Sequence, residues 1–447
     1  MSFIPHTDTD RQEMLAKIGV ERIADLFSDI PADRRYVDFD LPESLSEMEA
    51  KWELNALAEA NVDANHYACF LGAGAYNHYV PSVVDYALQR GEFYTAYTPY
   101  QPEISQGTLQ AIFEYQSMIC ALTGMEASNA SHYDGATSLA EAVIMAVNVH
   151  RGKRKKIVLS PTIHPEYRAV VRTYVQGMGL TIVGDTDLQA DLAALQAMID
   201  DDTVMLAVQN PNFFGQVEEL SSLAEACHAH KALLTVVADP ISLGMFKAPG
   251  DMGADIVVGE GQSLGGGLNY GGPYLGFFAT RNKYVRRMAG RLVGETTDAD
   301  GQRGYVLTLA TREQHIRRER ATSNICTNQG LLVLAASVYM AALGRCGLPK
   351  IASLCYHKAH YAAAQINALE GYEVWQGKPF FKEFVVKCPR PVAEINEHLL
   401  AEWEIIGGYD LGRDYPHLAD HMLVAVTETN TREEIDDLVA ALEEVAS

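Results

Sequence analysis

The chain has 447 residues, of which 48% are apolar and 21% charged, and its formal net charge is −23. This length suits two or three packed units, and the composition is ordinary for a soluble globular protein. The strong acidic balance argues against nucleic acid or an anionic membrane as a partner, because the phosphates of both would repel it. Its seven cysteines include no C-x-x-C pair, which indicates reduced thiols in a reducing compartment.

The first 65 residues are predicted to form a helical arm. Residues 10–18 have a helical pattern that ends before Gly19, and Ser46 with Glu49 forms a capping box that opens a helix to about Ala60. Such short helices have little core of their own, so we expect the arm to wrap another surface.

No signal peptide or membrane span is expected. The N-terminus lacks a basic region followed by an apolar core. The longest apolar run, Leu331–Leu343, has 13 residues, and a bilayer span needs about 20. A cytoplasmic protein is the resulting expectation.

The middle of the chain alternates between strand and helix patterns. Continuous apolar runs of this kind, separated by helices, predict a parallel sheet covered on both faces; the runs are 157–160, 180–183, 204–208, 233–238 and 255–258. After them comes a smaller block of helices and strands. We therefore predict a large doubly wound α/β domain over residues 66–343 and a small α+β domain over residues 344–447.

Two strand ends suggest a cofactor chemistry. The run 233–238 ends on Asp239, and the next run leads into a glycine-rich turn that contains Gln262. In pyridoxal phosphate (PLP) enzymes of the aspartate-aminotransferase class, such a carboxylate pairs with the pyridine nitrogen, and a lysine one strand later forms the Schiff base. Gln262 stands where that lysine would be, and an amide cannot form the imine. Asp239 before Pro240 also has a simpler interpretation as a turn former.

A third segment has the form of a phosphate-binding turn. Gly135, Ala136 and Thr137 open a helix, and backbone N–H groups at such a helix start hold the phosphate of PLP. Asp134 places a negative charge beside them and can cap the same N–H groups itself. Both interpretations stay open, and we favour the self-capped helix.

No metal site is expected. Cys355, His357 and His360 resemble a metal cluster only weakly, because they lie in a helical pattern with no further ligands nearby. Lys247 and Lys283, the lysines nearest to Gln262, are expected to be solvated. A Schiff-base lysine instead needs a desolvated site.

Three long segments carry a family resemblance. Residues 70–76, 97–125 and 311–329 resemble the signature of glycine decarboxylase, the P-protein of the glycine cleavage system. The likeness covers nearly the whole chain. In that family the protein is one chain of two homologous halves or two separate subunits, and this sequence is similar to the N-terminal half, or subunit 1. The Schiff-base lysine belongs to the other half.

The resemblance implies a PLP-dependent transferase-like fold and a division of labour. The complete P-protein binds glycine on PLP, releases CO2 and transfers the aminomethyl group to the lipoyl arm of H-protein, with the T- and L-proteins as further members of the system. It is an oxidoreductase of amino-acid catabolism. This chain would bind no PLP covalently, would carry no catalytic residue, and would keep Gln262 and Asp239 as vestiges beside a PLP-bearing homologous subunit 2.

Two other function classes remain open. One is a self-sufficient PLP transaminase or decarboxylase that uses another lysine. The other is a non-catalytic scaffold or regulatory protein. A co-purifying homologous chain with a lysine at the position of Gln262 would discriminate against both.

Two surface segments are candidates for contact with a partner or its channel. The first is rich in tyrosine, which also anchors ordinary interfaces; its candidates are Tyr97, Tyr100, Gln101, Glu103 and Ser105. The second contains Arg317 and Arg318 in a stretch of four arginines between residues 312 and 320. That stretch either docks a carboxylate-rich surface or forms an internal arginine network.

Overall fold

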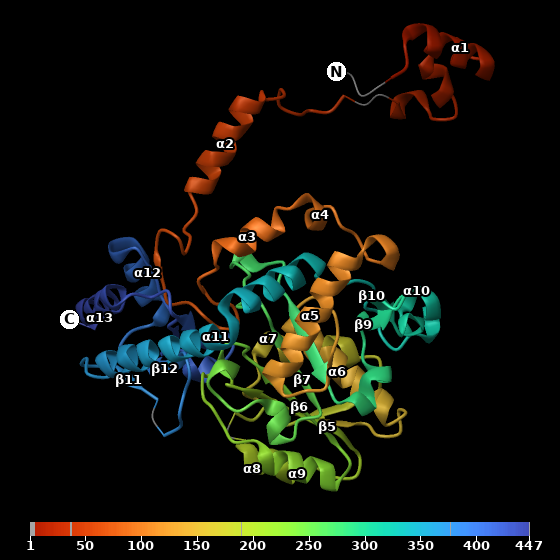
Figure 1. The fold of residues 1–447 in the computed structure, drawn as a ribbon. Helices are drawn as coiled ribbons and strands as arrows, with labels where there is room; N and C mark the ends of the chain where they lie inside the picture. The colour runs from red at the N-terminus through yellow and green to blue at the C-terminus, as the bar shows by residue number, and fades with distance from the viewer. Residues whose placement is uncertain (1–4, 36–37, 189, 376, 447) are drawn as a thin grey trace. The chain divides into compact units, whose positions relative to one another are not determined.

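The computed structural model describes residues 5–35, 38–188, 190–375 and 377–446 (Figure 1). It separates into two compact units, Met1–Val62 and Asp63–Ser447. The domain limits predicted at residues 343 and 344 stay a prediction, because the second unit is compact as a whole.

Over its described residues, 5–35 and 38–62, the N-terminal unit has helices and no buried residue. Helix α1 (Asp8–Ile18) is capped by Thr7 and ends at Gly19 in the left-handed region, and α2 (Glu47–Glu59) has the predicted capping box. Neither helix has a buried residue, and a 3₁₀ helix lies between them at Ile23–Phe27. That this region is an arm that wraps another surface stays a prediction.

A seven-stranded sheet forms the centre of the second unit. Its order is β2 (Ala127–Ser128), β8 (Gly276–Thr280), β7 (Ile256–Glu260), β6 (Leu233–Ala238), β5 (Thr203–Asn210), β3 (Lys156–Leu159) and β4 (Thr181–Val183). The strands from β4 to β7 are parallel, as predicted. Strand β8 runs antiparallel to β7, and β2 runs antiparallel to β8. The sheet is thus mixed, and this antiparallel edge is a correction to the predicted all-parallel sheet.

Alternate residues of the strands enter two different cores. Val158 and Leu206 pack on one face, while Ile157 and Met205 pack on the other. This follows from the two-residue period of a strand and from the continuous apolar sequence. Helices cover both faces (Figure 1): α5 (Gln106–Thr123) and α9 (Ser221–Ala229) lie on the first, and α6 (Gly135–Val149) and α7 (Pro165–Val175) on the second.

A four-stranded antiparallel sheet follows near the C-terminus. Its order is β11 (Glu373–Val374), β12 (Glu383–Lys387), β15 (His421–Ala425) and β14 (Tyr409–Asp410), and α12 (Val392–Trp403) and α13 (Arg432–Ala446) pack against it. Val385 and Leu423 pack instead on Phe213 and Phe214, which follow β5. The segment 210–215 therefore joins the two sheets, and it brings the start of β12 to the carboxyl ends of β5 and β6.

Helix α11 (Gly330–Ile366) connects both cores. It begins well before residue 344, the predicted start of the small domain, and is kinked at Gly344. By length and composition alone it is the one helix among the described residues that could cross a membrane. However, Tyr339 is buried in the core of the large sheet and Ile366 in that of the small sheet. These are the contacts of a core helix.

The remaining α-helices and strands of the described residues are short. They are α3 (Ser82–Leu88), α4 (Gly91–Tyr94), α8 (Leu192–Ala197), α10 (Gln314–Arg317), the parallel pair β1 (Ala68–Cys69) and β13 (Ile405–Ile406), and the hairpin β9 (Leu292–Thr297) and β10 (Arg303–Thr308).

Candidate functional site

The tyrosine segment forms an exposed surface. Tyr97 is 91% exposed, and the hydroxyl of the half-exposed Tyr100 accepts a hydrogen bond of 3.3 Å from Arg291. Gln101 and Glu103 are also exposed, and Ser105 is partly buried. A pocket of about 230 Å³ lies between this segment, α5 and the start of α11. Of the five candidates, Tyr97 lines this pocket.

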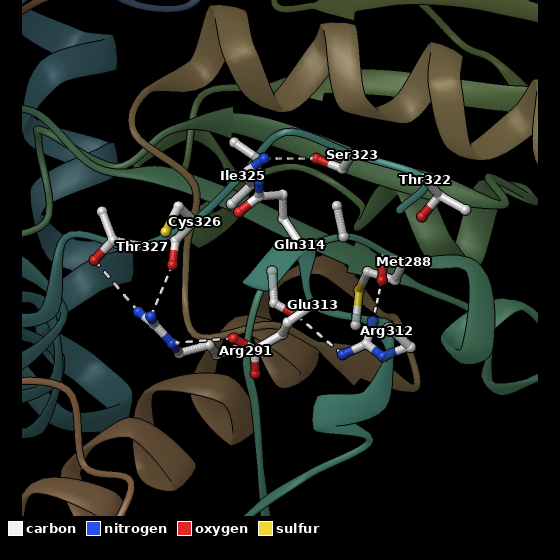
Figure 2. A pocket seen from close by; sticks show the side chains of 12 residues that line it. Met288, Arg291, Arg312, Glu313, Gln314, Thr322, Ser323, Ile325, Cys326 and Thr327 are labelled. Atoms are coloured by element: carbon white, nitrogen blue, oxygen red, sulfur yellow. Dashed lines mark hydrogen bonds and ion pairs between the residues drawn. The ribbon is translucent and has the colours of Figure 1, made fainter. Parts of the chain in front are cut away.

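The arginine stretch divides into an internal part, Arg312, which Figure 2 shows, and an external part. Arg312 donates to the carbonyl oxygens of Met288, Gly290 and Leu309, the last two at 2.9 and 3.1 Å. Arg317 and Arg318 are exposed. Arg312 therefore belongs to an internal hydrogen-bond network. Docking of a carboxylate-rich surface stays a prediction for Arg317 and Arg318.

The predicted Asp239 lines a small cavity at the carboxyl edge of the large sheet. The cavity has a volume of about 40 Å³, and its walls include Tyr76, His164, Tyr167 and Glu260. Asp239 follows β6, and Glu260 ends β7. His164 and Tyr167 lie at the start of α7. Ligands of open α/β sheets bind at this edge.

Asp239 is already paired with a buried lysine. Its Oδ2 lies 2.7 Å from Lys382 Nζ, and its Oδ1 accepts from the backbone N–H of Ile241 at 2.9 Å. Lys382 is 1% exposed, and its Nζ also lies 3.1 Å from His78 Nε2 and 3.5 Å from the ring centre of Tyr76. The ammonium group thus has three neighbours for its three protons. Sequence reasoning missed Lys382, which precedes a strand of the small sheet.

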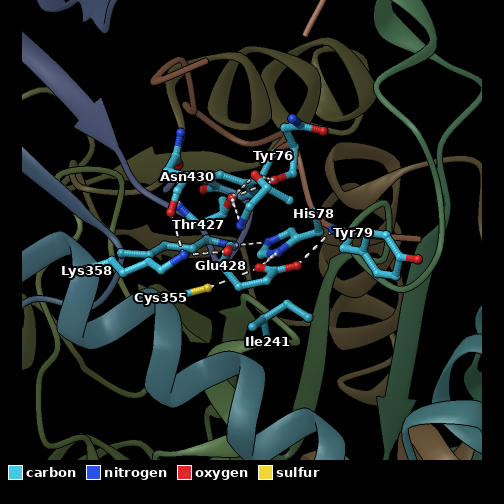
Figure 3. A network of polar contacts seen from close by, with 12 residues as sticks. Tyr76, His78, Tyr79, Ile241, Cys355, Lys358, Thr427, Glu428 and Asn430 are labelled. Carbon is cyan, nitrogen blue, oxygen red and sulfur yellow. Dashed lines mark hydrogen bonds and ion pairs between the residues drawn. The ribbon is translucent and has the colours of Figure 1, made fainter. Parts of the chain in front are cut away.

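The polar network continues from His78 to Glu428 (Figure 3). His78 Nδ1 lies 2.7 Å from Glu428 Oε2, and Glu428 Oε1 accepts from the backbone N–H of Tyr79 at 2.8 Å. Burial, together with Lys382, lowers the pKa of His78. Burial alone would raise the pKa of Glu428, but the bonds from His78 and Tyr79 lower it to about 2. A neutral His78 therefore accepts from Lys382 and donates to the carboxylate.

Three side chains of this network could be considered as metal ligands, but their spacing fits hydrogen bonds better. His78, Cys355 and Glu428 bring three ligand atoms within 4.8 Å of one another. Two nitrogen or oxygen ligands of a tetrahedral zinc ion lie roughly 3.3 Å apart, given bonds of about 2.0 Å. The 2.7 Å between His78 and Glu428 is shorter. Of the two histidines considered with Cys355 in the sequence, His360 stacks on Phe380.

Two carboxylates occupy the start of α6. Glu260 Oε2 accepts from the N–H of Gly135 at 2.9 Å, and Asp134 Oδ1 accepts from that of Thr137 at 2.7 Å, with Ala136 between them. Asp134 forms the capping box of the self-capped interpretation. Burial raises the pKa of Glu260 to about 7. Sequence reasoning missed this residue, although it ends a strand two positions before Gln262.

Gln262 holds another segment in place. Its side chain is buried, Oε1 accepts from the N–H of Tyr76 at 3.0 Å, and Nε2 donates to the carbonyl oxygens of Tyr76 at 3.0 Å and Gly266 at 2.9 Å. An amide can accept and donate, whereas a lysine ammonium can only donate. The glutamine therefore has a structural role of its own.

Comparison with known proteins places this chain in a family. The model of the glycine cleavage system P-protein matches residues 1–442. The chain belongs to the P-protein family. A protein of Desulforamulus reducens, named "Probable glycine dehydrogenase (decarboxylating) subunit 1", is 55% identical over 446 residues, which cover 99% of both chains.

Solved structures agree with this membership. A glycine decarboxylase (P-protein) of the glycine cleavage system, in inhibitor-bound form, is 43% identical with a TM-score of 0.90 and full coverage of both chains. A sphingosine-1-phosphate lyase of Burkholderia pseudomallei has a TM-score of 0.65 at 16% identity, over 93% of this chain and 94% of that one, and shows the fold alone. The predicted fold of PLP-dependent enzymes of the aspartate-aminotransferase class is confirmed.

The residues around the cavity do not fit the PLP that this fold implies. The two oxygens of Asp239 and the N–H group of Gly135 already have partners within this chain. A cavity of about 40 Å³ has room for only a few water molecules, because one water needs about 10–15 Å³ of such space. Lys247 is exposed and Lys283 is largely exposed beside Asp255, so neither lysine reaches the cavity.

Proposed function

We propose that this chain is the subunit of a heteromeric glycine dehydrogenase (decarboxylating) that does not bind PLP. One observation carries the proposal: Asp239, which would bind the pyridine nitrogen, is bonded to Lys382 inside the chain. The nearly full-length likeness to a protein named subunit 1 supports the assignment to this enzyme.

A homologous subunit 2 then supplies the lysine and PLP, which serves as the electron sink for loss of CO2 from glycine. The aminomethyl group passes to the lipoyl arm of H-protein, and the T- and L-proteins complete this cytoplasmic system of glycine catabolism. The present chain contributes surfaces. The exposed Tyr97 and Tyr100 suit a contact with subunit 2 or its channel, and Arg317 and Arg318 suit an acidic carrier.

The geometry of Lys382 weighs against a self-sufficient PLP enzyme. A Schiff base forms on the carbon opposite the pyridine nitrogen, across the ring. Lys382 Nζ lies 2.7 Å from the carboxylate that would bind that nitrogen. Its amine is therefore at the wrong end of the site for imine formation.

Exchange of CO2 with the carboxyl group of glycine tests the proposal. We expect exchange when this chain is co-purified with its homologous lysine-bearing subunit and supplied with PLP and lipoylated H-protein. Each subunit alone serves as the control and should show little exchange. Exchange at the full rate by this chain alone, with PLP, would contradict the proposal.

A further inference from the structure

The cavity at Asp239 lies between the two polar ends that a bound PLP would need. We propose that Lys382, Glu260 and Tyr167 take the places of the pyridinium nitrogen, the phosphate and the ring of PLP. These three side chains, and not only the missing lysine at Gln262, then exclude the cofactor. The inference rests on the proposal that this chain carries no PLP, and it names the residues responsible.

Lys382 is the stand-in at the pyridine end. A pyridinium offers one N–H donor and a positive charge to its carboxylate. The Lys382 ammonium offers Asp239 the same two features, with Nζ 2.7 Å from Oδ2. The side chain is 1% exposed, and the neutral His78 fixes its amine from the other side at 3.1 Å. A buried carboxylate is costly without such a partner. Asp239 is therefore satisfied without a cofactor.

Glu260 is the stand-in at the phosphate end. It accepts from the N–H of Gly135 at the start of α6, and its other oxygen accepts from the N–H groups of Gln262 and Leu275 at 3.0 and 2.9 Å. A phosphate dianion placed there would lose the Gly135 donor to this carboxylate. It would also meet the negative charge of Asp134, which caps the same helix start.

Tyr167 is the stand-in for the ring. Its ring stacks on that of His164, with centres 4.9 Å apart and an angle of 22° between the planes. Its hydroxyl reaches the start of α6, where a methyl group on Gly135 would lie 2.4 Å from it. A flat ring thus already extends between the wall of the cavity and the phosphate end. The cavity left beside this ring has a volume of about 40 Å³.

Pyridoxine 5′-phosphate separates this inference from the proposed function. The compound has an alcohol in place of the aldehyde, so its binding needs no lysine and reports only whether the space and the polar groups are free. Equilibrium dialysis on the full-length chain measures it. We expect no saturable binding to the wild type or to Gln262→Lys. The double variant Tyr167→Ala/Lys382→Ala should show saturable binding, with an affinity at least about tenfold above any residual affinity of the wild type.

Binding should also improve from pH 8 to pH 6, because the raised pKa of Glu260, about 7, makes this carboxyl neutral at the lower pH. Lys358→Ala is the matched control, because Lys358 donates to the Glu428 and Asn430 carbonyls in the same network and does not contact Asp239. Circular dichroism confirms that each variant is folded. Tyr167→Ala alone opens the ring space and replaces the double variant if that variant does not fold.

Saturable binding of the compound to the wild type would overturn the inference, and so would binding to Gln262→Lys as tight as that to the double variant. Neither result would contradict the proposal that PLP is bound by the other subunit. The absence of binding to every folded Tyr167 variant would overturn it as well. A PLP adduct on the wild-type chain, trapped by reduction of its imine with borohydride, would instead contradict the proposed function itself.

Discussion

Glu260 is a carboxyl group on which burial and hydrogen bonding act in opposite directions. Burial raises its pKa from 4.5 to about 7, although three backbone N–H groups favour the charged form. A carboxyl whose pKa is raised on folding stabilises the protein fully below its unfolded pKa. That contribution is lost as the pH rises through the folded pKa. The loss from Glu260 therefore falls between about pH 4.5 and 7 and reaches up to about 3 kcal/mol.

The variant Glu260→Gln should flatten this part of the pH dependence. The measurement is the free energy of unfolding in urea at pH 5 and at pH 8, for the wild type, Glu260→Gln and the exposed control Glu402→Gln. We expect the control to keep the wild-type difference between the two pH values. An equal difference in Glu260→Gln would show that this carboxyl does not change protonation on folding in that range.

The bonds of Gln262 give a second prediction at this scale. Gln262→Leu leaves the N–H and carbonyl groups of Tyr76 without their side-chain partner, and we expect a loss of about 2–4 kcal/mol of unfolding free energy. Hydrogen exchange at the Tyr76 amide should become faster. Gln89→Leu, at an exposed position, is the control. Unchanged stability and exchange would mean that Gln262 does not fix this segment.

At the scale of elements, the arginine stretch separates a fold-stabilising residue from surface ones. Arg312→Gln removes a donor from three backbone carbonyl groups, so we expect a cost of about 2–4 kcal/mol. Arg317→Gln/Arg318→Gln should change the unfolding free energy by less than about 0.5 kcal/mol, because both side chains are exposed.

The same double variant tests docking. It should raise the KM of the assembled enzyme for H-protein, and it should weaken the rise of KM with salt that charge attraction gives the wild type. A large loss of stability with an unaltered KM would leave only the internal network as the role of these residues.

The elements themselves also show how far sequence reasoning reaches. Strands β5 and β6 are continuous apolar runs, and α2 begins at its capping box, so local pattern was sufficient for them. Asp239 and Gln262 could be placed at the sheet edge for the same reason. Lys382 could not, because it reaches Asp239 only when the small sheet packs on Phe213 and Phe214. Glu260 and Tyr167 resemble an ordinary strand end and helix start until these contacts form.

At the scale of the whole molecule, the N-terminal unit has helices that need another surface. Helices α1 and α2 have no buried residue, and Trp52, Leu54 and Leu57 are each 60–65% exposed. Large apolar side chains that stay this exposed on one helix suit a contact with another surface. We expect that deletion of the residues before Pro31 weakens assembly with the homologous subunit and leaves the melting temperature of the remaining chain nearly unchanged. Undiminished co-purification of the truncated chain would exclude this role.

The central claim is that the two homologous chains divide the work and that PLP is bound covalently by the other one. Borohydride reduction of the assembled complex, followed by intact-mass measurement of each separated chain, tests it most directly. We expect one phosphopyridoxyl group per homologous subunit and an unmodified mass for this chain, since Gln262 has no amine and Lys382 is held by Asp239. A stoichiometric adduct on this chain, at Lys382 or any other lysine, would contradict the account.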